Sequence, residues 1–228
     1  MAEGYKDWSA GDILTAADLE DYTVKQSVMR FADSSARTTA LSGVLAEGMM
    51  SYLKDTDTVE VYDGSAWAAV GGKILQVVST TKTDTFTSTS ATFTAITGLS
   101  QAITPSSATS KILVIANLKG ASDEATAQCT FHYRLMRDST PIGIGDTSGS
   151  RTQVTGNLGT RSSGTTVVMM ADTAVILDSP STTSSITYSV EGRTRSAGTF
   201  YVNRTEDFTD SPFVPVAVSS ITVMEVSA

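Results

Sequence analysis

The stretch CTFHYRLM, residues 129–136, alternates strictly between apolar and polar side chains. Successive side chains of a β-strand point to opposite faces, so this period of two is typical of a strand with one face in a core. The other face then lies in water or at an interface. The side chains expected in the core are Cys129, Phe131, Tyr133 and Leu135, and those expected on the other face are Thr130, His132, Arg134 and Met136.

The chain around this stretch, from Lys73 onward, consists of further short strand-like segments separated by Gly, Ser, Asp and Pro. Gly71 and Gly72 mark its start. About ten short strands without a fixed repeat favour a sandwich and disfavour a propeller or solenoid. We therefore expect a mainly β protein whose residues 71–228 form a jelly-roll-like antiparallel β-sandwich head. The other segments expected to be strands are 74–78, 102–105, 111–116, 165–171, 175–177, 186–190, 199–202 and 221–226.

Residues 1–70 have a different pattern, which predicts a small helix-plus-hairpin module. Thr15 can cap a helix with Asp18 three residues later, so a helix is expected over residues 16–25. Residues 34–48 are expected to form a linking turn, followed by a hairpin with strands at 48–53 and 59–62 and a tight turn into Trp67. Because so few strands are marginally stable alone, we expect this module to pair with another subunit or a larger body.

Composition and charge narrow the classes of partner. The 228 residues carry 16 Lys plus Arg against 24 Asp plus Glu, a net charge of -8, which disfavours nucleic acid and anionic membranes. The 35 Thr and 30 Ser favour strands and turns over helices. No basic segment followed by an apolar run and no long apolar stretch is present, so neither a signal peptide nor membrane insertion is expected.

The candidate catalytic groups are few, and each has a simpler structural interpretation. His132 is the only histidine and lies on a strand, and Cys129, the only cysteine, points to the opposite face and cannot form a dyad with it. The carboxylates that could serve glycoside hydrolysis fall in expected loops, where they are ordinary turn formers. We therefore expect no enzyme activity, no catalytic residue, no metal site and no cofactor. Those carboxylates are Asp123, Glu124, Glu206, Asp207 and Asp210.

The aromatic and apolar residues of the N-terminal segment are better candidates for contacts than for chemistry. Trp8 precedes the expected helix and Trp67 ends the hairpin, where burial against a partner or against the hairpin itself explains a tryptophan better than sugar stacking does. The candidate anchor or interface residues are Trp8, Leu14, Leu19, Tyr22, Tyr62 and Trp67.

Several motifs of the chain resemble those of one protein family. The N-terminal part resembles the N-terminal module of virion fibre and minor tail proteins of tailed bacteriophages, and the C-terminal part is similar to the β-rich heads of the same proteins. The N-terminal motifs are WSAGDILTAADL at 8–19, QSVMRFAD at 26–33, EGMM at 47–50 and VYDGSAW at 61–67. The C-terminal motifs are QVVST at 76–80, SKILV at 110–114 and SITVME at 220–225.

The resemblance implies a homotrimeric virion component, with residues 1–70 attaching it to the virion and the head facing outward. The implied partners are further copies of the chain and other virion proteins of the tail, the portal or collar, or the capsid. The implied location is the virion, after synthesis in the host cytoplasm. The expected function is that of a non-enzymatic fibre, spike or capsid decoration involved in host adsorption.

Two alternatives remain open at this stage. The head could itself be a lectin-like receptor-binding protein for a host surface glycan, through loops 145–159 and 203–212 and the aromatic candidates Tyr201 and Phe208. A capsule depolymerase is less favoured, because such enzymes usually need a long β-helix with a groove of carboxylates.

Overall fold

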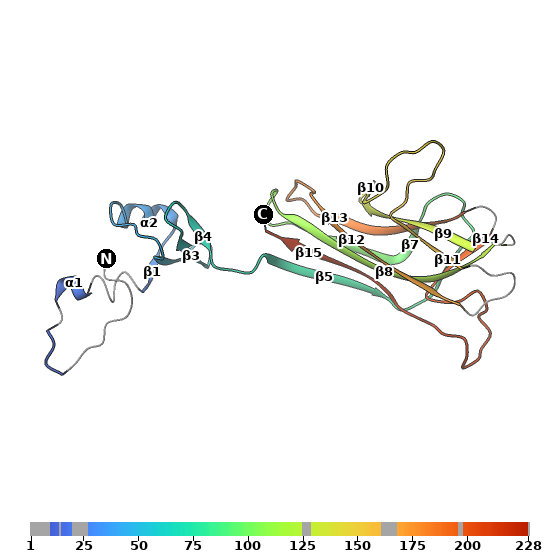
Figure 1. The fold of residues 1–228 in the computed structure, drawn as a ribbon, viewed down its shortest axis with the longest axis horizontal. Coiled ribbons are helices and arrows are strands. Elements are labelled where there is room, and N and C mark those ends of the chain that lie inside the picture. The colour runs from blue at the N-terminus through green and yellow to red at the C-terminus, as the bar shows by residue number, and fades with distance from the viewer. Residues whose placement is uncertain are drawn as a thin grey trace. The chain divides into compact units, whose positions relative to one another are not determined.

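A computed structural model describes residues 10–13, 15–19, 27–124, 129–160, 168–195 and 198–227. The chain divides into two compact units, Met1–Gly72 and Lys73–Ala228, and each is described by itself (Figure 1). The sequence pattern places the boundary between residues 70 and 71. The first unit contains α1 (Ala16–Leu19), β1 (Val28–Phe31), α2 (Ser34–Ala40), β2 (Met50–Leu53), β3 (Thr58–Tyr62) and β4 (Trp67–Ala69).

The second unit, which we call the head, contains β strands throughout its described part. They are β5 (Ile74–Lys82), β6 (Phe86–Ser88), β7 (Thr94–Ile103), β8 (Lys111–Glu124), β9 (Cys129–Arg137), β10 (Thr140–Ile142), β11 (Gly156–Thr160), β12 (Met170–Asp178), β13 (Ile186–Thr194), β14 (Gly198–Val202) and β15 (Ser219–Val226).

The first unit contains more regular structure than a helix and a hairpin. Its sheet has the order β1-β2-β3-β4, in which β2, β3 and β4 are antiparallel as expected. Strand β1 was not predicted, and it pairs with β2 in parallel. A parallel pair needs a crossover connection, and residues 32–49 supply it. The predicted helix over 16–25 starts as expected at Ala16, and α1 extends to Leu19, whereas residues 20–25 lie outside the described residues.

The expectation of a linking turn over residues 34–48 is wrong for its first half, because this crossover contains helix α2. Asp33 is its N-cap, and its side chain accepts a hydrogen bond from the Ala36 amide at 2.7 Å. An aspartate in this position satisfies one of the free amides of the first helical turn. The sequence signal was therefore Asp33 itself, which was hidden in a stretch rich in small polar residues.

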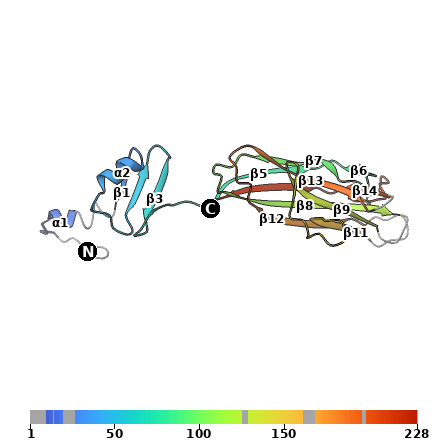
Figure 2. The same ribbon diagram turned by 90° about the horizontal axis from the view of Figure 1, so that it is seen from above.

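The head is a jelly roll, as the sequence pattern predicts. Its first sheet has the order β5-β15-β8-β14-β6 with β12 on the other edge of β8, and the second has the order β10-β9-β13-β7 with β11 also on β9. The eight main strands therefore have the orders β5-β15-β8-β12 and β7-β13-β9-β11, which is the strand order of a jelly roll with its first strand beside its last. All pairings are antiparallel, and the strands run along a similar direction (Figures 1 and 2).

The alternation in β9 is confirmed. Phe131, Tyr133 and Leu135 are at most 1% exposed in the core, while His132 and Arg134 are half-buried on the outer face. Met136 departs from the expected pattern, because it is buried although its position in the alternation places it on the outer face. The side chain of Cys129 lies outside the described residues.

Aromatic rings from both sheets meet in this core. Phe131 of β9 stacks on Phe200 of β14 with ring centroids 5.0 Å apart, and Phe86 of β6 lies 5.8 Å from Phe200. Gly120 of β8 allows this packing, because a Cβ there would lie 2.2 Å from the carbonyl oxygen of Tyr201 and 3.0 Å from the Phe131 ring. Any larger residue would push β14 away from β8.

Two tyrosines connect the sheets through hydrogen bonds at the edge formed by β12. Tyr133 donates to Asp172 at 2.8 Å and Tyr188 donates to Asp178 at 2.7 Å. Burial, followed by the bonded carboxylate, raises the pKa of each phenol. Both phenols therefore stay neutral donors, and the buried hydroxyls remain satisfied.

One buried carboxylate fixes the end of the sandwich. Glu225 of β15 points inward and accepts hydrogen bonds from Gln76 Nε2 at 2.7 Å and from the Ser106 amide and hydroxyl at 2.7 and 2.6 Å. Burial by itself raises the pKa of Glu225, but the bonds from Ser106, Gln76 and Ser110 outweigh it and bring the pKa to about 2. The charged carboxylate thus ties the β7–β8 connection to β15 and β5.

Candidate interaction sites

The predicted anchor residues Tyr62 and Trp67 are packed within the first unit. Arg37 of α2 is buried, with its guanidinium carbon 4.1 Å from the centre of the Trp67 ring. The centre of the Tyr62 ring lies 5.5 Å from that of the Trp67 ring. The same guanidinium donates to Ser51 at 3.0 Å and pairs with Glu60. The cluster therefore holds α2 on the sheet. Trp67 thus stabilises the first unit itself, independently of any contact with a partner.

The other four anchor candidates cannot be placed in a site. Trp8, Leu14 and Tyr22 lie outside the described residues, and Leu19 is the last residue of α1 with a side chain that is not described. Their role in attachment remains a prediction.

The receptor candidates Tyr201 and Phe208 both lie against Arg204. The guanidinium carbon of Arg204 is 4.7 Å from the Tyr201 ring centre and 4.1 Å from that of Phe208, which is cation–π geometry. Arg204 is held by its own bonds to the carbonyl oxygens of Thr205 and Glu206. The sequence pattern did not indicate Arg204, whose role depends on how the chain turns after β14.

These two aromatic residues differ in how much of the ring is available. Tyr201 belongs to β14, is 9% exposed, and donates its hydroxyl to Asp123 at 2.6 Å. Burial and then the bond to Asp123 raise its pKa. Phe208 lies in the β14–β15 loop and is 45% exposed. Phe208 is therefore the more accessible of the two, and Tyr201 serves as part of the scaffold.

Two of the carboxylates considered for hydrolysis, Asp123 and Asp207, are engaged in local structure. Asp123 accepts bonds from the Tyr201 hydroxyl and the Thr199 amide, and Asp207 accepts two bonds from Thr209, which lower its pKa. Asp63 caps its own turn by accepting bonds from Ser65 and Ala66, which likewise lower its pKa. Among the described residues no group of His, Cys, Asp and Glu could hold a metal ion.

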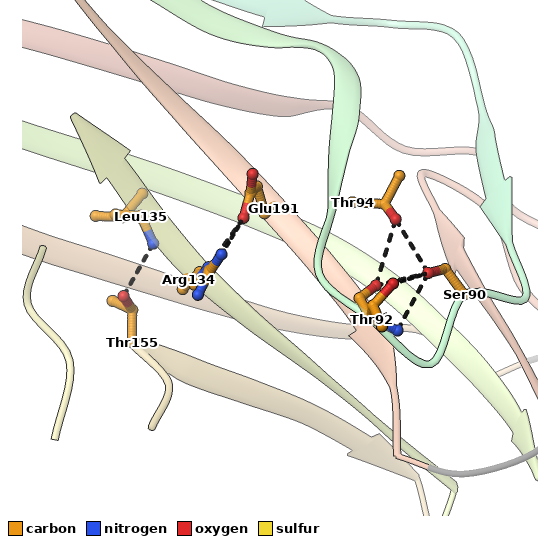
Figure 3. Close-up of polar contacts among 7 residues, drawn as sticks. All are labelled: Ser90, Thr92, Thr94, Arg134, Leu135, Thr155 and Glu191. Carbon is orange, nitrogen blue, oxygen red and sulfur yellow. Dashed lines mark hydrogen bonds and ion pairs between the residues drawn. The ribbon is translucent and has the colours of Figure 1, made fainter. Parts of the chain in front are cut away.

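The outer side of the second sheet, which we call the polar face, carries charged and hydroxyl side chains. Arg134 and Glu191 are directly opposite each other on β9 and β13 and form an ion pair with nitrogen–oxygen distances of 2.8 and 2.9 Å. Figure 3 shows them pointing toward one another, with Ser90, Thr92 and Thr94 hydrogen-bonded together where β7 begins. The guanidinium of Arg134 also lies 4.2 Å from the Phe93 ring centre. The polar face comprises His132, Arg134, Thr187, Ser189, Glu191 and Arg193.

The outer side of the first sheet is different, and we call it the apolar face. Val77, Val175 and Leu177 are each more than half exposed, and further apolar side chains beside them are half-buried. The continuous apolar runs at 112–116 and 175–177 were the sequence signal for it, since a strand that is apolar on both sides is typical of one covered on both sides. The apolar face comprises Val77, Leu113, Ile115, Val175, Leu177, Met224 and Val226.

Within the described residues, no helix is both long and apolar enough to cross a membrane.

Comparisons with known proteins add little to this description. No family model and no curated protein matches the chain. Similar solved structures include that of infectious bursal disease virus, Gx strain, at 14% identity and a TM-score of 0.36, and the VP2 subviral particle of infectious bursal disease virus, at 15% and 0.31. Each covers 73% of this chain, which spans about two fifths of theirs, 40% and 41%. At these values the likeness carries no conclusion about function, and the jelly-roll assignment rests on the strand order alone.

Proposed function

We propose that the protein is a non-enzymatic structural component of a phage particle, a trimeric fibre or spike whose head faces outward and takes part in host adsorption. The first unit attaches to the virion through residues 1–70. The resemblance of the sequence motifs to phage fibre and minor tail proteins motivates this proposal. The location on the virion and the trimeric state are parts of the same proposal.

The observation that supports a contact role most directly is the apolar face. One end of the outer side of the first sheet is apolar across four strands, whereas the described candidate carboxylates Asp123 and Asp207 accept hydrogen bonds from their own surroundings. A large apolar patch on the surface of a protein marks a binding surface. The features of this head therefore favour binding over catalysis.

Incorporation into particles tests the proposal. Purified phage particles should contain the full-length protein, detected by mass spectrometry after density-gradient purification. A chain that begins at Gly72 should fold into the head and yet be absent from particles. Particles that lack the full-length chain would overturn the structural role, and incorporation of the shortened chain would overturn the role of the first unit alone.

The alternative, a lectin-like receptor-binding head, is favoured by one observation, the exposed ring of Phe208 beside Arg204. An aromatic ring with a neighbouring cation suits a sugar that carries a carboxylate. Phe208→Ala should weaken adsorption of the protein to host cells. The matched control is Phe213→Ala, because Phe213 is an exposed aromatic residue of the same loop outside the Arg204 cluster. Equal adsorption by both variants and the wild type would exclude Phe208 from the receptor site.

A further inference from the structure

The apolar face is built from strands that are far apart in the sequence. Antiparallel pairing places Leu177 opposite Leu113, Leu113 opposite Met224, and Met224 opposite Val77. One apolar row therefore crosses all four strands β12, β8, β15 and β5. The next row, Val175, Ile115, Thr222 and Ser79, is apolar on two strands, and the third, Thr173, Asn117, Ser220 and Thr81, is polar.

The two ends of this outer side therefore differ in polarity. It is apolar toward the end where Val226 pairs with Ile74, and it carries hydroxyl and amide groups toward the other end. The opposite side of the same strands is the fully buried core, with Ile112 and Val114 of β8 at 0% exposure. Strand β8 is thus apolar on both sides, although the head by itself buries only one of them.

The charges on this face favour a second copy of the chain as its occupant. At the described outward positions of residues 75–81, 111–119, 171–177 and 220–226, the only charged side chains are Lys111 and Lys119. Each already donates within its own chain, Lys111 to Ser179 at 2.7 Å and Lys119 to Asn117 at 3.2 Å and to the Val218 carbonyl at 3.1 Å. A chain with net charge -8 repels its own copies wherever carboxylates meet, and on this face none do.

The size of the face also suits such a contact. Four strands about 4.8 Å apart and nine residues rising about 3.4 Å each outline roughly 19 by 30 Å, on the order of 600 Å², of which the apolar rows occupy about half and the polar rows the rest. The corrugated accessible surface exceeds this flat outline, so it is comparable with the ~800 Å² that each partner contributes to a standard protein interface. In a closed oligomer of identical chains, every subunit presents the same surface to the symmetry axis.

We infer that the apolar face is the surface through which copies of the head associate with one another. The inference deepens the proposed function by naming the subunit contact of the spike. Its three-fold stoichiometry rests on that proposed function, whereas the identity of the face does not.

The test is the mass of the full-length protein in solution, measured by light scattering. The wild type should give about 72 kDa, three times the chain mass of 23.9 kDa. The double variant Val77→Glu, Leu177→Glu should give about 24 kDa, because it places carboxylates where the copies meet. Both side chains are more than half exposed, so the fold should survive, which far-ultraviolet circular dichroism checks.

The control for an added carboxylate is Ala102→Glu, which places one glutamate at an exposed position of β7 on the other sheet and should keep the wild-type mass. Val175→Lys is a second, single variant of the apolar face, with the opposite charge and the same expected dissociation. A folded double variant or a folded Val175→Lys that keeps the wild-type mass would overturn the inference, and so would a wild type that is monomeric at all concentrations.

These outcomes separate the inference from the proposed function. A wild-type trimer unaffected by the variants would refute the apolar face and leave the spike intact. Absence of the protein from purified particles would refute the spike, while dissociation of the variants would still support the face.

Discussion

The two outer sides of the head differ although both belong to the same sandwich. On β9 the outward residues His132 and Arg134 are polar, and Arg134 pairs with Glu191 of the neighbouring strand. On β8 the outward residues Leu113 and Ile115 are apolar and lie beside Leu177 and Val175. The charged and hydroxyl side chains of the polar face are stable in contact with water. The side chains of the apolar face are stabilised only when another surface covers them. The comparison teaches that a regular alternation of apolar and polar residues indicates a strand with one face in water. A continuous apolar run indicates a strand whose second face is covered by a partner.

The largest effect on stability is expected at Phe131, whose side chain is buried within a single copy of the chain. Phe131→Ala removes a fully buried ring that stacks on Phe200, so the free energy of unfolding should fall by about 3 to 5 kcal/mol. Because the loss arises inside one chain, urea unfolding should show it equally at low and high protein concentration. A loss that appears only at high concentration would mean that the core is completed by another copy.

A smaller effect is expected at Glu225, the carboxylate that β15 turns inward while its outward neighbours Met224 and Val226 remain apolar. Its folded pKa of about 2 lies below the ordinary glutamate pKa of 4.5, so its contribution to stability is present above about pH 4.5. That contribution is lost as the pH falls from 4.5 toward 2. Glu225→Gln should lower the free energy of unfolding by about 2 kcal/mol at pH 7.

The measurement for Glu225 is urea unfolding of both proteins from pH 7 to pH 2.5. The difference between wild type and variant should shrink through the window below pH 4.5. A difference that stays constant through that window would show that the charge of Glu225 does not stabilise the fold. Asp146→Asn is a control, because Asp146 is an exposed carboxylate in the loop between β10 and β11 and its replacement should change the free energy of unfolding little.

A direct comparison of the two faces comes from Ile115→Ala on the apolar face and Thr187→Ala on the polar face. If copies cover the apolar face, Ile115→Ala should cost about 1 to 2 kcal/mol at a concentration where the wild type is assembled, and much less where both are monomeric. Thr187→Ala should cost about 0.5 kcal/mol or less at either concentration. Identical behaviour of the two variants under dilution would remove the distinction between the faces.

The smallest effect is expected for the ion pair of the polar face. Both side chains are partly exposed, so a double-mutant cycle of Arg134→Ala and Glu191→Gln should give a coupling of about 0.5 to 1 kcal/mol. The coupling should decrease when salt is raised, because ions screen exposed charges. A coupling that is insensitive to salt would indicate that the pair is shielded, and the polar face would then be covered as well.

Much of the head could be predicted from local patterns. The alternation of Phe131, Tyr133 and Leu135 fixed which side of β9 is core, since only one register places all three in an apolar environment. The first unit was harder to predict. Strand β1 is only four residues long and gains its stability from β2, and α2 depends on the cap at Asp33 and on packing of Arg37 over Trp67. Short elements of this kind have weak intrinsic preferences, so their partners decide them.

The candidate sites were predicted less well for the same reason. Phe208 could be selected as a loop aromatic, but the position of Arg204 between it and Tyr201 requires the turn after β14. Tyr201 could not be recognised as largely buried, because its cover comes from Arg204 and its hydroxyl partner Asp123 lies on another strand.

The sequence by itself determined the class of fold, most of the longer strands of the head and the inward side of β9, because these follow from the local alternation of side chains and from turn residues. Only the tertiary structure decided that Leu177, Leu113, Met224 and Val77 form one row, since the strands that carry them are brought together by pairing across up to about 150 residues of chain. Strand pairing between distant segments is a property of the whole fold, and the surface that such pairing assembles cannot be read from any one segment.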